Sequence, residues 1–331
     1  MNPTQRAPGA GEVFLTGASG FVGAHVLSAL LARGYRVRAL VRGGWDAPAG
    51  AVAVHGDLRS PGALITALRG CDAVVHTAAL YSFAPSDRAT IAAVNVRGTA
   101  GILEAARIAG VGRCVVTSSS AALAPATASR PATETDWATA DHRTWSYHAS
   151  KLAGERAALR APIPVITVLP TAPVGPGDRR PTPTGKIVVD LLRGRMPATL
   201  GGGMNIVPVE DVAAAHVLAL ERGRPGERYI AGGVNLTLAE LWRLISRAAG
   251  RPERTVRLPY AIAAAAARLD AARVRLTGGV PAIPLEGVRM GRLEMYSSSA
   301  KAGEELGYRP SSADAAIERA VRWYRENGYA A

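Results

Sequence analysis

Tyr147 and Lys151 are the residues whose types and spacing most directly suggest chemistry. They are four positions apart at the start of a predicted helix, so their side chains share one helical face. An ammonium near a phenol favours the phenolate and lowers its pKa from about 10 towards the working pH. Such a tyrosine can give a proton to a carbonyl oxygen as hydride arrives, or take one in reverse. The alternative is an exposed helical pair without a chemical role.

A run of hydroxyl side chains, Thr117 to Ser120, lies upstream of this pair. It ends a predicted strand, Arg113–Ser118, and therefore falls at one edge of the sheet. A serine that faces Tyr147 from this edge would orient the carbonyl oxygen. The run thus supplies the second part of a proton-transfer site.

Three glycines, Gly17, Gly20 and Gly23, follow an apolar segment that starts at Val13 and precede a helical apolar pattern. A strand, a glycine turn and a helix N-terminus together form the phosphate-binding corner of dinucleotide folds. The spacing here is G-x-x-G-x-x-G, and a plain turn between strand and helix is the alternative. The position between strand and helix favours the nucleotide interpretation.

The elements needed to position these residues alternate along the chain. Further strands are predicted at Arg36–Val41, Ala51–His55, Asp72–His76 and Val165–Leu169, with helices at Pro61–Leu68, Arg88–Ala109 and Ser146–Leu159 between them. This alternation predicts an α/β fold of the Rossmann type, a doubly wound parallel sheet with helices on both faces. Its ligand is expected outside the carboxyl ends of the strands.

From about Pro170 the regular alternation of strands and helices ends, because five prolines lie in a segment that is expected to be a loop. Beyond it we expect a smaller, mostly helical lobe, with helices at Lys186–Arg193, Val209–Glu221, Leu238–Ala249, Pro259–Ala272 and Ala313–Asn327. The predicted organisation is a disordered arm at 1–10, a dinucleotide-binding domain at 11–175 and a substrate lobe at 176–331. Some segments of the lobe are expected to return to the sheet.

The composition narrows the possible partners. The net charge of +13 comes from arginine, since only three of 39 basic residues are lysine, and the scattered arginines argue against a nucleic-acid stripe. No apolar run approaches the roughly 20 residues of a membrane helix. The alanine-rich segment from Tyr260 to Leu269 is predicted to be a packed helix, with an interfacial helix as the alternative. Cys71 and Cys114 lack metal-like spacing and are expected to be buried, which suggests a reducing, cytoplasmic compartment.

Arg42 stands where many NAD-binding folds carry an acid that holds the ribose hydroxyls. Its guanidinium would pair with a ribose 2′-phosphate, which favours NADP over NAD; a surface arginine is the alternative. Asp57 after the third strand could accept the adenine amino hydrogens, or be a turn cap. The small residues Thr77 to Ala79 would let backbone pass beneath a dinucleotide. Asn95 disfavours a helix interior, so we expect it to bind backbone or a water near the cofactor.

The motifs Thr16–Gly23, Gly56-Asp57-Leu58, His76–Ala79, Asn95–Thr99 and Tyr147-x-x-x-Lys151 occur in the order seen in the extended short-chain dehydrogenases/reductases, which the sequence resembles. In its second half it is similar to the hopanoid-associated sugar epimerases, through segments such as Pro181–Gly185, Gly194–Ala198 and Leu306–Pro310, and also to dihydroflavonol-reductase-like enzymes.

The resemblance implies Ser119 as the catalytic serine, with Ser118 and Ser120 as alternatives, Tyr147 as proton donor and acceptor, and Lys151 as the residue that holds the nicotinamide ribose. It also implies a homodimer that forms through the tyrosine helix. The cofactor contacts that we expect are Gly17, Ser19, Gly20, Phe21, Val22, Gly23, Arg42, Asp57, Leu58, Thr77, Ala78, Ala79, Asn95, Thr117, Ser118, Tyr147, Lys151, Pro170, Thr171 and Ala172.

These observations favour an NADP-dependent oxidoreductase that acts on a secondary alcohol or ketone of a sugar-like or polycyclic molecule. A nucleotide-sugar epimerase without net redox change and a non-catalytic NADP sensor are the alternatives. Epimerases that retain NAD commonly carry an acid where Arg42 stands, which argues for net reduction. The pocket is expected between the sheet edge and the lobe, with Tyr81, Phe83, Trp145, His148 and Met204 as candidate lining residues.

Overall fold

The computed structural model describes residues 11–81, 87–139, 146–195, 198–253, 256–278, 281 and 285–330. The predicted arm at 1–10 lies outside this range, and so do Phe83 and Trp145. Among the described residues, no helix has both the length and the apolar character to cross a bilayer.

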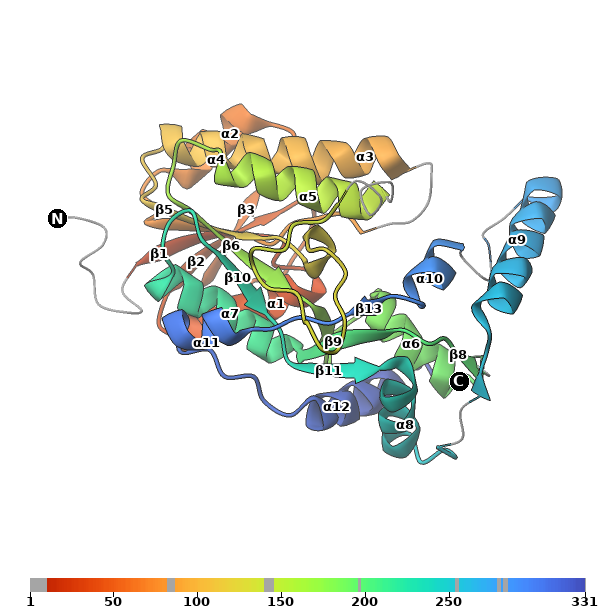
Figure 1. The fold of residues 1–331 in the computed structure, drawn as a ribbon. Coiled ribbons are helices and arrows are strands. Elements are labelled where there is room, and N and C mark those ends of the chain that lie inside the picture. The colour runs from red at the N-terminus through yellow and green to blue at the C-terminus, as the bar shows by residue number, and fades with distance from the viewer. Residues whose placement is uncertain are drawn as a thin grey trace.

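A seven-stranded sheet in the order β10-β6-β5-β4-β1-β2-β3 forms the centre of the molecule (Figure 1). Neighbouring strands are parallel throughout, which confirms the predicted fold class. The strands are β1 (Glu12–Thr16), β2 (Arg36–Val41), β3 (Ala51–His55), β4 (Ala73–His76), β5 (Arg113–Thr117), β6 (Val165–Pro170) and β10 (Arg228–Ala231).

The strand order reverses at β1. From β1 the chain moves outward through β2 to β3, then returns to place β4 on the other side of β1. The carboxyl ends of β1 and β4 therefore border a crevice, the position where open α/β sheets bind ligands. Thr16 and His76, the last residues of these strands, are paired in register there.

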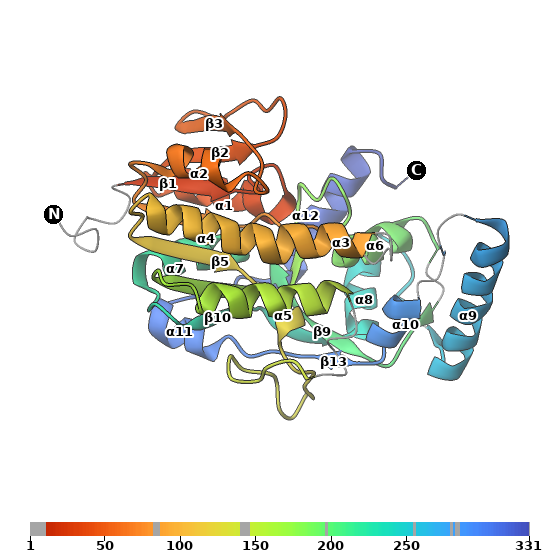
Figure 2. The same ribbon diagram turned by 90° about the horizontal axis from the view of Figure 1, so that it is seen from above.

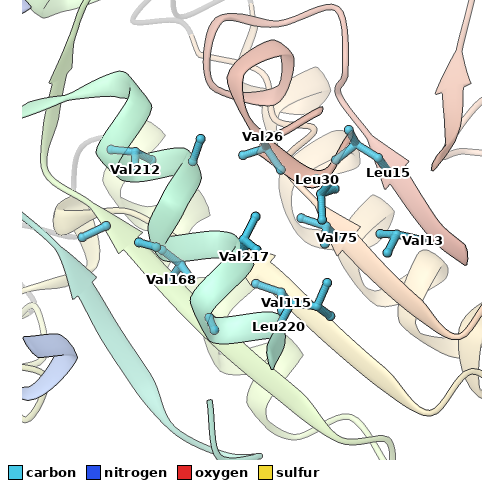
Figure 3. Packing of buried hydrophobic residues seen from close by; sticks show 14 of the residues in the cluster. Val13, Leu15, Val26, Leu30, Val75, Val115, Val168, Val212, Val217 and Leu220 are labelled. Atoms are coloured by element: carbon cyan, nitrogen blue, oxygen red, sulfur yellow. The ribbon is translucent and has the colours of Figure 1, made fainter. Parts of the chain in front are cut away.

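Helices cover both faces of the sheet (Figure 2). One face carries α1 (Phe21–Ala32), α7 (Val209–Arg222) and α11 (Ala300–Leu306); the other carries α2 (Pro61–Leu68), α4 (Thr99–Ile108) and α5 (Ser146–Leu159). Val13 and Leu15 pack towards α1, whereas Phe14 packs towards α2 and α4, as alternation along a strand requires (Figure 3). Two apolar layers thus hold the strand ends in fixed positions.

The long helix predicted at 88–109 is interrupted. It consists of α3 (Arg88–Ala92), a π-helical stretch η3 (Ala93–Gly98) and α4. Single π turns inside α-helices are frequent at functional sites. Asn95 is buried in the middle of this stretch, where the wider turn lets its side chain point at neighbouring segments.

The remaining chain forms a lobe with its own small sheet of β7 (Ala172–Val174), β9 (Gly203–Pro208), β11 (Val234–Thr237) and β13 (Glu294–Met295). Three helices pack on it, α6 (Pro183–Leu192), α8 (Leu238–Ala248) and α12 (Ala313–Glu326). Two short strands, β8 (Ala198–Thr199) and β12 (Val256–Arg257), precede α9 (Tyr260–Thr277) and α10 (Leu285–Met290).

The proline-rich segment is more regular than the sequence suggests. Pro170 ends β6, and Pro173 lies within β7, which pairs with β9. Pro183 occupies the first turn of α6, where its missing N–H costs nothing, and the Thr182 hydroxyl caps that helix. The division into domains at residue 175 stays a prediction, although α7 and β10 from the later region do lie on the main sheet.

Candidate active site

The glycine corner lies at the carboxyl end of β1. Gly17 has φ +81°, a conformation that glycine adopts without strain, and its carbonyl accepts a hydrogen bond of 2.9 Å from the Gly20 amide. A Cβ atom on Gly23 would collide with the Gly17 carbonyl and lie 2.6 Å from Thr77 Oγ1. Only glycine therefore allows α1 to start this close to the turn.

The N-terminus of α1 is suited to an anion. In this fully described helix, Gly20 is the N-cap residue, no side chain makes a capping hydrogen bond, and the first turn carries no acidic residue. The first N–H groups of a helix lack intrahelical acceptors, and the helix dipole adds positive potential there. These backbone groups, framed by Thr77 and Ala78 from the end of β4, fit the pyrophosphate of a dinucleotide.

Tyr147 and Ser119 meet across the crevice. Ser119 follows β5, and Tyr147 lies in the first turn of α5. Burial raises the pKa of the Tyr147 phenol to about 12, and a side-chain hydrogen bond with Ser119 opposes this rise. Ser119 Oγ also accepts a hydrogen bond of 3.1 Å from the Ala121 amide. Ser118, in contrast, is buried and its hydroxyl has no partner among the described residues.

The pKa of Tyr147 thus departs from the sequence-based expectation that Lys151 would lower it. Lys151 directs its ammonium at the Thr117 carbonyl, with Nζ 2.7 Å from the oxygen. Burial lowers the pKa of this ammonium to about 8, although Glu155 partly counteracts the shift. Desolvation therefore disfavours the charged forms of both the phenol and the amine.

Thr117 itself is held from the opposite side. Its hydroxyl is 2.7 Å from His216 Nε2, and His216 Nδ1 is 2.8 Å from the Val212 carbonyl of α7. Because a carbonyl only accepts, Nδ1 carries the proton and Nε2 accepts from the threonine. The hydroxyl of Thr117 is thereby committed to His216, and its carbonyl to Lys151.

Asn95 clamps three segments together. Its side-chain oxygen accepts from the Leu80 amide at 2.7 Å, and its nitrogen donates to the Leu80 carbonyl at 2.9 Å and to Ser150 Oγ at 3.0 Å. Ser150 in turn donates to the Tyr147 carbonyl at 2.7 Å. The expected backbone partner of Asn95 is therefore present, and Asn95 ties the helix that carries Tyr147 to Leu80 in the segment after β4.

Tyr81, at the end of this segment, packs against the phenol of Tyr147 with ring centroids 4.2 Å apart and the ring planes tilted by 53°. His148 lines a pocket formed by the segment after β5 and the segment around β13. The other lining residues are Ser120, Leu123, Ala124, Pro125, Leu293, Met295, Tyr296 and Ser297. Met204, on β9, packs against the core of the lobe. The pocket therefore lies between the sheet edge and the lobe, as expected, but of the candidate lining residues His148 contributes to it, whereas Tyr81 and Met204 do not.

The segment from Pro170 to Ala172 passes along the same sheet edge. Thr171 Oγ1 donates to Asn205 Oδ1 at 2.9 Å, and the Thr171 amide donates to the Ala231 carbonyl at 3.3 Å. The first bond joins the end of β6 to β9 of the small sheet, and the second joins it to β10 of the main sheet.

Arg42 follows the last residue of β2 and is exposed. Asp57 lies near it, and the charge of Arg42 is one of the causes that lower the Asp57 pKa to about 2. The first cause is Arg59, whose guanidinium forms a bidentate pair with the same carboxylate, with Nη2 2.7 Å from Oδ2. Asp57 is thus already paired, and the Arg42 side chain is exposed beside the end of β2.

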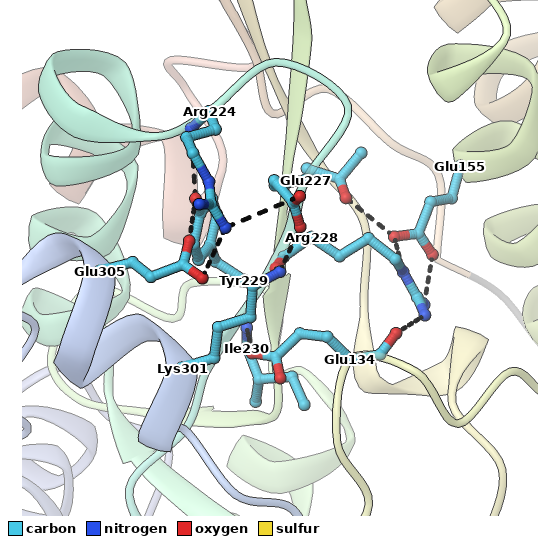
Figure 4. Close-up of polar contacts among 10 residues, drawn as sticks. Glu134, Glu155, Arg224, Glu227, Arg228, Tyr229, Ile230, Lys301 and Glu305 are labelled. Atoms are coloured by element: carbon cyan, nitrogen blue, oxygen red, sulfur yellow. Dashed lines mark hydrogen bonds and ion pairs between the residues drawn. The ribbon is translucent and has the colours of Figure 1, made fainter.

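A buried ion pair anchors α5 to the sheet (Figure 4). Arg228 Nε on β10 lies 2.9 Å from Glu155 Oε1, and the two side chains are 6% and 0% exposed. Thr167 of β6 donates to the same carboxylate at 3.0 Å, and the guanidinium lies 3.5 Å from the centre of the Trp137 ring. Glu155 is two turns after Tyr147, so this pair fixes the helix that carries the phenol.

The residues that hold these segments from behind have no role assigned to them from the sequence. His76 is buried between Thr16 Oγ1 at 2.7 Å and Thr99 Oγ1 at 3.0 Å, and burial lowers its pKa to about 3. His216, Ser150, Glu155 and Arg228 also hold the segments that carry Thr117 and Tyr147. The sequence signal for such residues is a polar side chain on an otherwise apolar face of a helix or strand. This signal does not identify the distant residue to which the side chain binds.

Comparisons with known proteins show what the chain is similar to. A family model described as the NAD dependent epimerase/dehydratase family matches residues 13–232. A Synechocystis sp. protein provisionally named dihydroflavonol 4-reductase is 37% identical, over 96% of this chain and 95% of its own. Sterol demethylase protein B from Methylococcus capsulatus is 33% identical, over 95% of this chain and 98% of its own.

Solved structures extend the likeness to the whole fold. The structure of the protein gox2253 has a TM-score of 0.83 and 39% identity, and it covers 96% of this chain and 98% of its own. A dTDP-glucose 4,6-dehydratase from Streptomyces venezuelae, solved with NAD bound, has a TM-score of 0.75 and 28% identity, with 95% and 97% covered.

Proposed function

The chain belongs to the NAD dependent epimerase/dehydratase family, within the extended short-chain dehydrogenases/reductases, and we propose that it is an NADPH-preferring reductase of polycyclic ketones. Membership of this NAD(P)-dependent oxidoreductase family is the premise. The cofactor preference, the roles of the site residues and the substrate class are the proposal. The observation that carries it most directly is the half-buried phenol of Tyr147, which forms a side-chain hydrogen bond with Ser119.

The glycine corner and the free N–H groups of α1 would hold the pyrophosphate. Lys151 donates to the Thr117 carbonyl at the end of β5, and a ribose hydroxyl could replace this carbonyl as the acceptor. When bound, the nicotinamide supplies or accepts the hydride. The protein's own task is then to place the substrate carbonyl and move one proton.

Tyr147 is suited to donate that proton. With a pKa near 12, the phenol is protonated at neutral pH and can hydrogen-bond the substrate carbonyl oxygen together with Ser119. Hydride arrival makes the oxygen strongly basic, and the phenol gives up its proton to form the alcohol. The balanced reaction converts a ketone, NADPH and a proton to a secondary alcohol and NADP⁺, and bulk water restores the phenol's proton.

Arg42 supports the preference for NADPH. An exposed guanidinium just beyond β2 can form two parallel hydrogen bonds with a ribose 2′-phosphate. Asp57 is neutralised by Arg59, so its repulsion of a phosphate is reduced. The positive charge at this end of the crevice therefore matches the additional phosphate that distinguishes NADP from NAD.

The pocket supports a polycyclic substrate. Leucine, alanine, proline and methionine account for five of its nine lining residues, and Ser120, His148, Tyr296 and Ser297 add polar groups. Such a wall suits an apolar ring system better than a sugar diphosphate, which needs many hydrogen-bonding groups. The names of the relatives, a dihydroflavonol reductase and a sterol demethylase protein, describe polycyclic substrates.

The test is turnover with the purified protein. NADPH is mixed with a panel of polycyclic ketones and keto-sugars, and reduced-nicotinamide absorbance is followed together with product. We expect one NADPH consumed for each alcohol formed from a polycyclic ketone, and turnover that is about 10²–10⁴-fold slower in Tyr147→Phe. Product from a nucleotide sugar without NADPH consumption would establish the epimerase instead. Tight NADPH binding without turnover across the panel would favour a sensor.

A further inference from the structure

Helix α9 has two apolar faces. On one face Ala263, Ala264 and Ala267 are buried against Val288 of α10 and neighbouring apolar side chains. The helix lies at one end of the molecule in both ribbon views (Figures 1 and 2). Its small packed face seats it on α10 and leaves the opposite face outward.

The outward face carries a continuous apolar stripe. Ile262, Leu269 and Leu276 are 55%, 72% and 88% exposed, and the exposed Ala265 and Ala272 lie between them. Steps of three and four residues place all five positions along one line of an α-helix. Scattered exposed apolar residues are ordinary in soluble proteins, whereas an exposed row of this kind indicates an interaction surface.

The charges beside the stripe are almost all positive. Arg268 and Arg275 flank it on one side and Arg273 on the other. The acid in α9, Asp270, is paired with Arg273, with Nη2 2.7 Å from Oδ1. Residues 256–293 contain six arginines and two acids, so this segment carries a net positive charge.

We propose that α9 docks on an anionic membrane surface, with the stripe in the acyl boundary and the flanking arginines on lipid headgroups. Interfacial helices combine an apolar face with flanking basic residues in this way. Arginine stems can bury their methylenes while the guanidinium reaches phosphate. A second copy of the chain is a poorer occupant, because pairing two such helices would bring arginines together while Asp270 is already committed.

This docking goes beyond the proposed reductase activity and does not depend on it. The stripe belongs to the lobe and is separate from Tyr147, Ser119 and the pocket lining. Changes on it are therefore expected to alter membrane binding while NADPH-dependent turnover of a water-soluble ketone stays the same.

The test is co-sedimentation of the full chain with vesicles of phosphatidylcholine alone or mixed with phosphatidylglycerol. We expect binding to the anionic vesicles that weakens with salt and falls at least about tenfold in Leu269→Ser/Leu276→Ser. Arg268→Glu/Arg275→Glu should lose the anionic preference. Val52→Ser/Ile108→Ser is the matched control, because it removes two exposed apolar side chains from the other end of the molecule, and it should bind like the wild type.

Failure of the wild type to bind anionic vesicles would overturn the proposal, as would equal binding by the serine variant. Sedimentation velocity adds a separate check. A dimer that dissociates in Leu269→Ser/Leu276→Ser would assign the stripe to a second copy. Thermal unfolding of each variant is measured as the control, and we expect every variant to unfold like the wild type.

Discussion

Lys151 donates a hydrogen bond of 2.7 Å to the carbonyl oxygen of Thr117, so the helix that carries the phenol is tied to the strand that carries the serine. The same threonine is held through its hydroxyl by His216 of α7. Elements on the two faces of the sheet thus converge on one residue at its edge. The separation of Ser119 and Tyr147 is fixed by this convergence.

The burial of Lys151 is expected to cost stability at neutral pH. Its pKa of about 8 in the folded protein lies below the ordinary 10.5. Below pH 8 both folded and unfolded chains hold the proton, and the full penalty is present. Between pH 8 and 10.5 the folded chain releases its proton first, so the free energy of unfolding rises with pH. The total change is roughly 3 kcal/mol, by 1.36 kcal/mol per unit.

Lys151→Met removes this penalty but also removes the bond to Thr117. We expect it to stabilise the fold by about 1–2 kcal/mol at pH 7 and to abolish turnover. Lys186→Met, at an exposed lysine, is the control and should change little. Chemical denaturation across pH 6–10 measures both effects; a pH-independent stability for wild type would contradict the assignment.

Ser119 and Ser118 are expected to differ sharply. Ser119→Ala removes the hydroxyl that faces Tyr147, and Tyr147→Phe removes the proton donor, so each should lower kcat by about 10²–10⁴-fold. Ser118→Ala deletes a buried hydroxyl without a described partner and should leave kcat unchanged. Steady-state kinetics with NADPH binding measured in parallel separates the roles. If Ser118→Ala lost activity and Ser119→Ala did not, the catalytic serine would be Ser118 and the assignment to Ser119 would be wrong.

Arg42 is expected to control cofactor choice. Arg42→Ala should weaken NADPH binding by about ten- to a hundredfold, the value of a charge-assisted bidentate contact, and leave NADH binding unchanged. Arg36→Ala, at the exposed opposite end of the same strand, is the matched control. Fluorescence titration with both cofactors gives the ratio. Equal losses for NADPH and NADH would show that Arg42 does not contact the 2′-phosphate.

The Glu155–Arg228 pair is expected to hold α5 in place. Glu155→Gln leaves a buried guanidinium without its counter-charge and should cost about 3–5 kcal/mol of unfolding free energy. Glu155→Leu/Arg228→Met removes both charges and should recover most of it. Urea unfolding of the three proteins decides the point. A double variant no more stable than Glu155→Gln would mean that the contact with Trp137 matters more than the charges.

The sequence predicted the parts of this molecule that follow from local patterns. The glycine spacing, the apolar alternation of the strands and the pair Tyr147 and Lys151 led to the sheet, the corner and the crevice. It did not predict the π-helical turn around Asn95, because local propensity does not distinguish it from a regular helix. Nor did it predict the raised pKa of Tyr147, since desolvation depends on how the surrounding elements pack.

The sequence likewise did not predict contacts between polar residues that are far apart in the chain. Glu155 and Arg228 are 73 residues apart in the sequence, and they meet because β10 places Arg228 beside α5. His216 likewise meets Thr117 across 99 residues. Periodicity shows which face of an element is apolar, but the identity of a buried polar partner requires the three-dimensional arrangement.

The position of β10 at the edge of the sheet has a consequence for how the chain is made. When the ribosome has released β6, that strand still exposes an unpaired edge, and the face of α1 that later packs against α7 is bare. Both stay open until residues 209–231 emerge. The nucleotide-binding half is thus an incomplete folding unit during synthesis, and a truncated gene product ending near residue 175 should aggregate rather than bind cofactor.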